Sequence, residues 1–310
     1  MSILSQNLNS IGSSRIEDKL KAKLGAVLSQ GNDIIMLQDL RLNEGQDNFK
    51  KNMLAKAINE IKSPFANNSW LFTNSPKNNR GVCIIIKKQN CILNSNIVHQ
   101  DLLGNLLILK ITFNFGILYL ANIYGPNEQN KTFYEHLSKT ITNLNDNELG
   151  LVIAAGDWNC VMSDLPLNIN PDLIDCKSIP NSANGDGLRK LAETNGLYDI
   201  YRINNAGTKA YTFKHFSGNR KARSRLDFFL ISKLSNDIRK PSFESKILPR
   251  LTTLFDHRPV LLKIKKIDRE TRIEHQKTKQ TIPNMGTITK EGASLIFVHK
   301  AVETAHDHLL

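Results

Sequence analysis

Short apolar segments recur along the first 266 residues, and they constrain the fold of this chain more than any other feature. They are rich in Ile, Val, Leu and aromatic residues and are bounded by Gly, Asn or Pro, which is typical of β-strands. The expected strands are 2–9, 33–38, 81–88, 106–113, 116–124, 149–158, 210–213, 224–232 and 259–266. Helical patterns occupy 15–29, 46–61, 131–145 and 186–195. We therefore predict an α/β (α+β) four-layer sandwich, in which two mixed β-sheets pack face to face with helices outside.

The composition is that of an ordinary globular protein, with 40% hydrophobic and 23% charged residues among 310. No apolar run approaches the roughly 20 residues of a membrane helix, so we expect an intracellular protein without a membrane partner. None of the four cysteines forms a C-x-x-C pair, which argues against a zinc site or a disulfide scaffold. After Lys266 the sequence turns polar, so we expect one domain at 1–266 and a linker or tail at 267–310, whose end can form a short helix.

The formal net charge is +12, from 41 Lys and Arg against 29 Asp and Glu. Such an excess favours a polyanionic partner, because each neutralised phosphate releases counterions. Part of the charge is concentrated in a run without an acidic residue, made of Lys209, Lys214, Arg220, Lys221, Arg223 and Arg225. A run of this kind is often only a solvated face. Since this one lies between two expected strands, it favours a basic hairpin tip.

Polar side chains stand at the ends of several of the apolar segments. They are Asn7, Asn9, Asp39, Tyr124, Asp157, Asn159, Asp227, Asp256 and His257. Sites in α/β folds gather at strand ends and in the loops that follow them. Carboxylates can bind a hard cation, a His beside a carboxylate can move a proton, and Asn or Tyr can hold phosphate oxygens. The set favours metal-assisted hydrolysis of a phosphodiester, although each residue alone also fits a turn or a packed side chain.

Asp39 illustrates this ambiguity, since it ends the apolar run "DIIMLQDLRL". Taken alone, it reads as an ordinary polar residue at the end of a buried strand. The other candidates favour a metal ligand, because a carboxylate at this strand end is what the rest of the set lacks.

The order of these motifs resembles that of the endonuclease/exonuclease/phosphatase superfamily, which includes the exonuclease III-type apurinic endonucleases. The motifs are QN-x-N from Gln6, Gln38–Asp39, N-x-Y-x-P from Asn122, GD-x-N from Gly156, R-x-D-x-x-L from Arg225, and Asp256–His257. The closest likeness is to the apurinic-endonuclease-like endonuclease domain of LINE-type (non-LTR) retrotransposons. It rests on Asn9, on "NIYGPN" and "GDWNCVMSDL", and on "LRKLAETNGLYDIYRINNAGTKAYTFKHFSGNRKARSRLDFFLIS". The resemblance covers roughly 1–266 and implies a DNase I-like fold.

The resemblance implies a role for each strand-end residue. Asp39 stands where the family has its metal-binding Glu, and Asp256 completes the metal side of the site. Asn7 would orient the phosphate or a metal-bound water, and Tyr124 would contact the phosphate. Asp157 would position or deprotonate the attacking water, with Asn159 stabilising the transition state. His257, held in its tautomer by Asp227, would act on the scissile phosphate.

The same resemblance implies a nucleic-acid surface. Segment 214–223 matches a variable hairpin that the family places against the DNA minor groove, and Arg80 also fits the pattern. The residues expected to contact nucleic acid are Asn9, Arg80, Lys214, Arg220, Lys221, Arg223 and Arg225.

The implied activity is that of a DNA endonuclease, a hydrolase dependent on Mg²⁺ with Mn²⁺ as a substitute. It would nick one strand of duplex DNA and leave a 3′-hydroxyl, which in complete elements primes reverse transcription. The implied partners are double-stranded DNA and, in a parent element, a reverse transcriptase and the element RNA. We expect a monomer in the nucleus, with passage through the cytoplasm.

Two departures keep alternatives open. Asp39 replaces the family's Glu, and no reverse-transcriptase region follows in this sequence. One alternative is an apurinic/apyrimidinic repair endonuclease, and another is a catalytically weakened nucleic-acid-binding derivative. A phosphatase of small phosphoesters is less suited, because a basic hairpin has no use for so small a substrate.

Overall fold

The computed structural model describes residues 1–10, 16–42, 48–61, 65–76, 79–147, 150–217, 220–232 and 241–266. The chain divides into two units, one of Met1–Lys233 with Ser245–Lys263 and the other of Leu234–Glu244 with Ile264–Leu310. In the described part of the second unit, Lys265 Nζ lies 3.2 Å from Glu244 Oε2. The expected tail at 267–310 lies outside the described residues.

Among the described residues, two six-stranded sheets form the centre of the fold. One holds, in spatial order, β14 (Pro241–Ile247), β15 (Val260–Lys266), β1 (Ser2–Asn7), β2 (Ile34–Gln38), β4 (Val82–Lys87) and β3 (Ser69–Asn74). The other holds β10 (Leu197–Asp199), β13 (Asp227–Ser232), β8 (Leu151–Asp157), β7 (Gly116–Tyr124), β6 (Leu106–Phe113) and β5 (Ile92–Gln100). Each sheet is mixed, because β1 runs parallel to β2 and β7 runs parallel to β8, whereas β15, β4, β6 and β13 pair antiparallel with β1, β2, β7 and β8 respectively.

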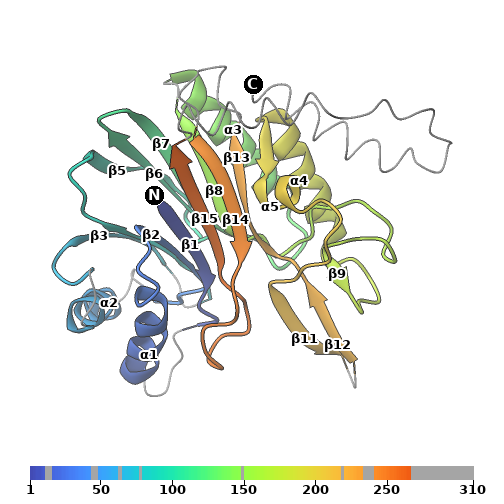
Figure 1. The fold of residues 1–310 in the computed structure, drawn as a ribbon, viewed down its shortest axis with the longest axis horizontal. Helices are drawn as coiled ribbons and strands as arrows, with labels where there is room; N and C mark the ends of the chain where they lie inside the picture. Colours follow the sequence, from blue (N-terminus) through green and yellow to red (C-terminus); the bar gives the residue numbers. More distant parts are fainter. Residues whose placement is uncertain are drawn as a thin grey trace, which may run out of the picture. The chain divides into compact units, whose positions relative to one another are not determined.

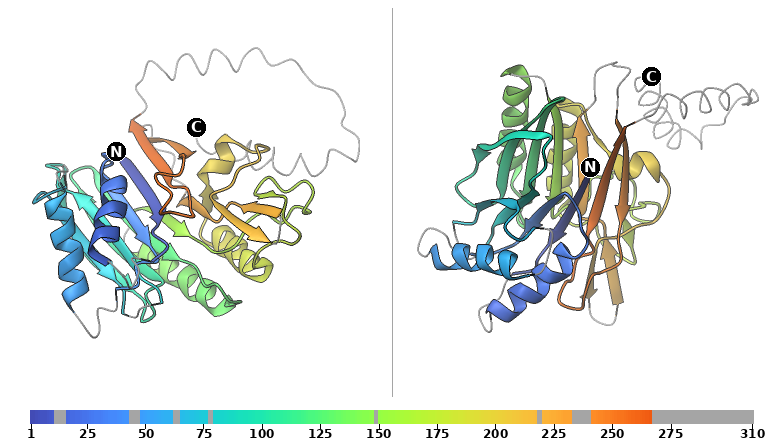
Figure 2. Two further views of the ribbon diagram at one scale, coloured as in Figure 1. Left: turned by 90° about the horizontal axis from the view of Figure 1, so that it is seen from below. Right: turned by 60° about the vertical axis from the view of Figure 1, so that its left-hand side comes forward.

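Helices cover the outer face of each sheet (Figure 1). Helices α1 (Ile16–Leu28) and α2 (Asn48–Glu60) pack on the sheet that contains β1, and α3 (Lys131–Asn147) and α4 (Ser182–Thr194) pack on the sheet that contains β8. The apolar stripe expected on α1 is present, since Leu20, Leu24, Val27 and Leu28 are all fully buried. Figure 2 shows the same arrangement from two further sides. The predicted four-layer sandwich is confirmed. No described helix is long and apolar enough to cross a membrane.

The inner faces of the two sheets are tied together by polar side chains as well as by apolar ones. Gln38 Nε2 donates to Asn122 Oδ1 at 2.7 Å, and Asn122 Nδ2 donates to the carbonyls of Leu37 and Cys83 at 3.0 and 2.8 Å. Both side chains are fully buried. A buried hydrogen bond of this kind is costly to break, so it fixes the position of one sheet against the other.

A third, smaller sheet lies beside the sandwich in the described residues. It contains β11 (Phe213–Ser217), β12 (Arg220–Ser224) and the short β9 (Leu173–Ile174). Figure 1 shows β11 and β12 as a hairpin that projects beyond the main sheets. This hairpin carries the basic segment that the sequence singled out.

The structure corrects several predicted elements. The expected strand 224–232 begins later, because β13 begins at Asp227, and the expected strand 210–213 is replaced by β11, which begins at Phe213. Strands β3, β5, β9, β10, β12 and β14 and the short helix α5 (Ile200–Asn204) were not predicted. The sequence of β5 lacks a continuous apolar run, because β5 is an edge strand with mostly exposed or half-buried side chains.

Candidate active site

Strand pairing brings most of the predicted site residues to one edge of the sandwich. The parallel pair β7 and β8 places Tyr124 beside Asp157, and the antiparallel neighbour β13 begins with Asp227 opposite Asp157. On the other sheet, Asn7 ends β1, and His257 lies just before β15, which runs antiparallel to β1. The ends of some strands and the beginnings of others therefore meet at the same place.

Asp157, Asp227 and His257 form a buried cluster at this edge. His257 Nδ1 lies 2.8 Å from Asp227 Oδ2, and His257 Nε2 lies 3.8 Å from Asp157 Oδ2. Each of the three residues is no more than 5% exposed. The imidazole is thus oriented by Asp227 on one nitrogen and faces Asp157 with the other.

The charges in this cluster shift the pKa of two members. Burial by itself lowers the pKa of His257, but the attraction of Asp227 and Asp157 for the imidazolium outweighs it and raises the pKa to about 10. Burial raises the pKa of Asp157 to about 7, with His257 opposing this rise and Asp227 adding to it. At neutral pH His257 therefore carries a proton, and Asp157 is poised between its two protonation states.

Two asparagines hold the Asp157 carboxylate in place. Asn7 Nδ2 donates to Asp157 Oδ2 at 2.8 Å, and the Asn159 backbone N–H donates to Asp157 Oδ1 at 2.9 Å. Asn159 Nδ2 donates to the carbonyl of Gly125 at 2.8 Å, which turns the side chain back toward the end of β7. Gly125 is required here, because a Cβ would lie 2.2 Å from the carbonyl oxygen of Trp158. The structure brings Asn7, Asp157 and Asn159 together as a positioned group.

Thr212 and Phe213 support the cluster and were not predicted from the sequence. The Thr212 hydroxyl accepts hydrogen bonds from the backbone N–H groups of Leu226 and Asp227, both at 3.0 Å. The ring of Phe213 packs against the imidazole of His257, with centroids 4.7 Å apart. The base of the β11–β12 hairpin is therefore part of the wall around His257. The "YTF" segment of the sequence was the available signal.

Asp39 is buried, and Arg41 binds both of its carboxylate oxygens. Arg41 Nε donates to Oδ1 at 2.9 Å and Nη2 donates to Oδ2 at 3.0 Å. Asp39 is 3% exposed. Both residues have a positive φ, 58° at Asp39 and 60° at Arg41. Sequence reasoning missed Arg41, although its place two residues after Asp39 was visible.

Tyr124 lies in the same region, and its phenol stays protonated. Burial raises the pKa of Tyr124 to about 12, and the nearby charges of Asp39 and Asp157 add to the rise. A neutral phenol can donate a hydrogen bond to an anionic oxygen. Asn105 fixes the backbone of this residue, because its side chain donates to the Tyr124 carbonyl and its carbonyl accepts from the Tyr124 N–H at 2.8 Å.

Lys23 is a second cation near the predicted metal side. Its Nζ donates to the carbonyls of Leu8, Asn9 and Ser10 at 2.5, 3.1 and 2.7 Å, and the residue is 5% exposed. Burial lowers the pKa of Lys23, while Asp256 and Asp39 oppose that change. The sequence signal for this residue was a lysine placed within the apolar stripe of α1.

The two residues implied as metal ligands differ in how they suit a cation. Asp256 Oδ1 is buried and has no hydrogen-bond partner among the described residues. A carboxylate oxygen that binds a cation is expected to have this setting. Asp39 offers the right oxygen chemistry, but Arg41 occupies both of its oxygens. The residues present therefore fit a hard cation, which at Asp39 would compete with the guanidinium of Arg41.

The predicted nucleic-acid residues lie in different settings. Asn9 is exposed, with a φ of 48°. Arg80 is half-buried, and its Nη1 donates to Asn105 Oδ1 at 2.6 Å. Lys214 is exposed on β11, directly opposite Arg223 of β12.

Arg223 and its two basic neighbours complete the hairpin. Arg223 Nη2 donates to Asp175 Oδ2 at 2.7 Å, and its guanidinium lies over the ring of Tyr211. The backbones of Arg220 and Lys221 belong to β12, but their side chains lie outside the described residues.

Arg225 requires a correction, because it is 1% exposed and belongs to an internal ion-pair network. Its guanidinium binds the carboxylates of Asp172 and Asp199, and Asp172 also binds Arg202. An arginine with these partners has no access to nucleic acid. We therefore assign Arg225 a structural role.

Comparisons with known proteins give the fold but no close relative. No protein-family model matches the chain. No curated protein matches it either.

Solved structures do match. A 3′–5′ exonuclease (NExo) from Neisseria meningitidis is 19% identical with a TM-score of 0.60, covering 86% of this chain and 100% of that one. An AP endonuclease from Archaeoglobus fulgidus is 16% identical with a TM-score of 0.58, covering 85% and 99%. The endonuclease domain of TRAS1, a telomere-specific non-LTR retrotransposon, is 15% identical with a TM-score of 0.55, covering 85% and 97%. This chain therefore shares the fold of these solved structures, which is the DNase I-like four-layer sandwich expected from its sequence.

Proposed function

We propose that the protein is a metal-dependent DNA endonuclease that nicks one strand of a duplex and leaves a 3′-hydroxyl. The observation that carries this proposal is the Asp157, Asp227 and His257 cluster, with Asn7 and Asn159 holding the Asp157 carboxylate. It combines a group that can take a proton near neutral pH with a cation beside it. That combination suits attack of water on a phosphodiester.

The proposed step can be followed atom by atom. Water attacks the phosphorus, the P–O3′ bond breaks, the 3′ oxygen leaves as a hydroxyl with a proton from solvent, and the phosphate stays on the 5′ side. Asp157 takes the proton of the attacking water, since its pKa of about 7 lets it act as a base at neutral pH. His257 is protonated and held by Asp227, so it stabilises the negative charge that develops on the phosphate oxygens.

The remaining groups bind and orient the phosphate. Tyr124 can donate its phenolic hydrogen to a phosphate oxygen, because its pKa of about 12 keeps it neutral. A Mg²⁺ or Mn²⁺ ion, when bound, would supply further positive charge beside the phosphate. Asp256 and Asp39 are the residues that would hold it. The net charge of +12 and the basic β11–β12 hairpin suit a polyanionic substrate.

Plasmid nicking tests the proposal directly. The native protein should convert supercoiled plasmid to the open circle in Mg²⁺, and a DNA polymerase should extend the nick because it ends in a 3′-hydroxyl. His257→Ala should lower the nicking rate by roughly 100-fold or more, since it removes the cation beside the phosphate.

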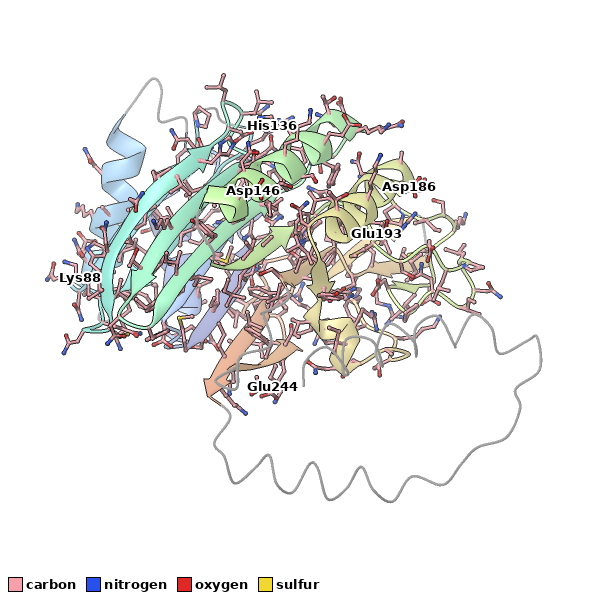
Figure 3. The ribbon with its side chains drawn as sticks, turned by 90° about the horizontal axis from the view of Figure 1, so that it is seen from above. Lys88, His136, Asp146, Asp186, Glu193 and Glu244 are labelled. Atoms are coloured by element: carbon pink, nitrogen blue, oxygen red, sulfur yellow. The ribbon has the colours of Figure 1, made fainter. Side chains whose placement is uncertain are left out.

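A matched control is His136→Ala, which removes an exposed imidazole from α3 (Figure 3) and should leave the rate unchanged. No nicking by the native protein at any enzyme excess, or a His257→Ala rate equal to the native one, would overturn the proposal.

The LINE-type role is the finer part of the proposal. It is supported by the shared fold with the TRAS1 endonuclease domain, whose length is almost fully covered by the match. In this role the nick would prime reverse transcription in the nucleus, with a reverse transcriptase and its RNA as partners.

A second candidate is cleavage at abasic sites, which the likeness to the archaeal AP endonuclease favours. The two functions predict different substrates. Cleaving matched duplexes with and without one abasic site separates them, because a repair enzyme prefers the abasic duplex strongly and a LINE-type nickase does not.

A further inference from the structure

Arg41 forms a two-pronged contact with the carboxylate that the proposed function assigns to the metal. Both N–H···O distances are about those of strong charge-assisted hydrogen bonds, at 2.9 and 3.0 Å. The Asp39 side chain is 4% exposed, whereas the Arg41 side chain is 40% exposed. The pair therefore joins a buried acid to a cation that reaches it from the solvent side.

The backbone around this pair is fixed, so the contact is built into the fold. The Leu40 N–H donates to the carbonyl of Gly81 at 3.1 Å, and the Arg41 N–H donates to the carbonyl of Arg80 at 2.8 Å. The left-handed φ values at Asp39 and Arg41 turn the chain so that the guanidinium folds back over the carboxylate. Left-handed conformations at non-glycine residues persist only where the surroundings impose them.

The charges nearby show which cation can leave. Asp39 and Asp256 are acids that act on Lys23, and Lys19 and Arg41 are cations that act on it. Lys23 is 5% exposed and donates to three backbone carbonyls, so it cannot move without orphaning buried groups. Arg41 binds the Asp39 carboxylate, also forms a hydrogen bond with Tyr124, and has a side chain that is 40% exposed, so its guanidinium can swing away into solvent.

We propose that Arg41 is a displaceable occupant of the metal site, which a divalent cation must replace at Asp39 in order to bind. The inference rests on the proposed function, because it takes Asp39 and Asp256 as the metal residues. Arg41 competes with the cation for the same two oxygens. It therefore lowers the affinity of the free enzyme for the ion and makes activity respond to ion concentration over a higher range.

Titrating Mn²⁺ into the full chain by calorimetry, without DNA, tests this inference. Arg41→Gln removes the competing charge and should tighten Mn²⁺ binding by roughly tenfold. Arg41→Lys keeps a charge that can contact only one oxygen at a time, and it should show a smaller gain. This second variant decides the question if Arg41→Gln does not fold.

A matched control is Arg189→Gln, which breaks another arginine–aspartate pair on α4. Arg189 binds Asp186, and Figure 3 shows Asp186 on the outer side of that helix. This variant should bind Mn²⁺ within about twofold of the native protein, since it makes the same change in net charge away from Asp39.

The double variant Asp39→Asn/Arg41→Gln shows whether the gain acts through Asp39, and it should lose the tighter binding. The inference is overturned if Arg41→Gln and Arg41→Lys bind Mn²⁺ no more tightly than the native protein, or if the gain survives in the double variant. These readouts need no cleavage. A protein that binds Mn²⁺ as expected but fails to nick plasmid would contradict the proposed function and leave the role of Arg41 intact.

Discussion

The pKa of Asp157 is set by opposing effects of its neighbours. Burial and Asp227 raise this pKa, whereas the charge of His257 and the hydrogen bonds from the Asn159 backbone and the Asn7 side chain hold it at about 7. The nicking rate should therefore rise with pH through about 7, where Asp157 loses its proton, and fall near 10, where His257 loses its own.

Asn7→Ala should move the rising part of this pH profile to higher pH, by roughly one pH unit, because the carboxylate loses a donor that favours its charged form. The profile is measured as initial nicking rate against pH at saturating Mg²⁺. Asn96→Ala, which removes an exposed amide from β5, should leave the profile as it is. An Asn7→Ala profile that coincides with the native one would show that this hydrogen bond does not set the pKa.

Individual residues also show which parts of the candidate site could be predicted from the sequence and which could not. Asp157, Asp227 and His257 were predictable because each stands at the border of an apolar run in a recognisable order. Arg225 was wrongly assigned to the nucleic-acid surface. The run of basic residues does not show that one of them forms a buried ion pair with Asp172, which lies 53 residues earlier in the sequence. Arg41 was missed because its pairing with Asp39 needs two left-handed residues, which no apolar pattern reports.

The β11–β12 hairpin is the element to which the proposed function assigns DNA binding. Its base packs against His257 through Phe213, and its exposed Lys214 lies opposite Arg223. Each lysine that meets a phosphate releases counterions, so its loss should reduce the salt dependence of binding.

Lys214→Gln should weaken duplex binding and reduce the slope of log K against log salt by about 0.9. The slope is measured by fluorescence anisotropy with a labelled duplex in Ca²⁺. Lys88→Gln makes the same change in charge at the opposite end of β4 from the site, and Figure 3 shows Lys88 at the periphery. It should leave the slope almost unchanged. Equal slopes for Lys214→Gln and the native protein would show that Lys214 does not contact the DNA backbone.

At the level of elements, the strands with strong apolar patterns were predictable and the edge strands were not. β2, β4, β6, β7 and β8 are buried on both faces or nearly so, which gives each of them a continuous apolar run. β5 and β14 lie at sheet edges, where polar residues are tolerated on both faces. Their sequences therefore resemble loops.

Across the whole molecule, the Asp172 network joins parts of the chain that are distant in sequence. Asp172 binds Arg202 of α5 and Arg225, and Arg225 binds Asp199 at the end of β10. Burial by itself would raise the pKa of Asp172, but the attraction of Arg225 and Arg202 outweighs it and lowers the pKa. A carboxyl group with a lowered pKa stabilises the folded state above its unfolded pKa, and this stability is lost as pH falls through the folded value.

Asp172→Asn should lower the free energy of unfolding by roughly 3 kcal/mol at pH 7, because Arg225 is left with one buried partner. The difference from the native protein should shrink below about pH 4, where native Asp172 begins to lose its own contribution. Urea unfolding between pH 7 and pH 3 measures both. Asp175→Asn, at the exposed partner of Arg223, should cost about 1 kcal/mol or less. A difference that stays constant with pH would contradict this account.

The small third sheet separates the proposed DNA-binding surface from the candidate active site, and this separation bears on how the protein can change. Among the described residues, β12 pairs with β9 at two positions, Arg223 with Ile174 and Ser224 with Leu173. The groups that support Asp227 and His257 lie at Thr212 and Phe213. The segment from Lys214 to Ala222 can therefore be exchanged in sequence and length while the catalytic cluster keeps its support. Under the proposed function, evolution or an engineer exchanging hairpins can redirect the protein to a new target site without rebuilding the candidate active site.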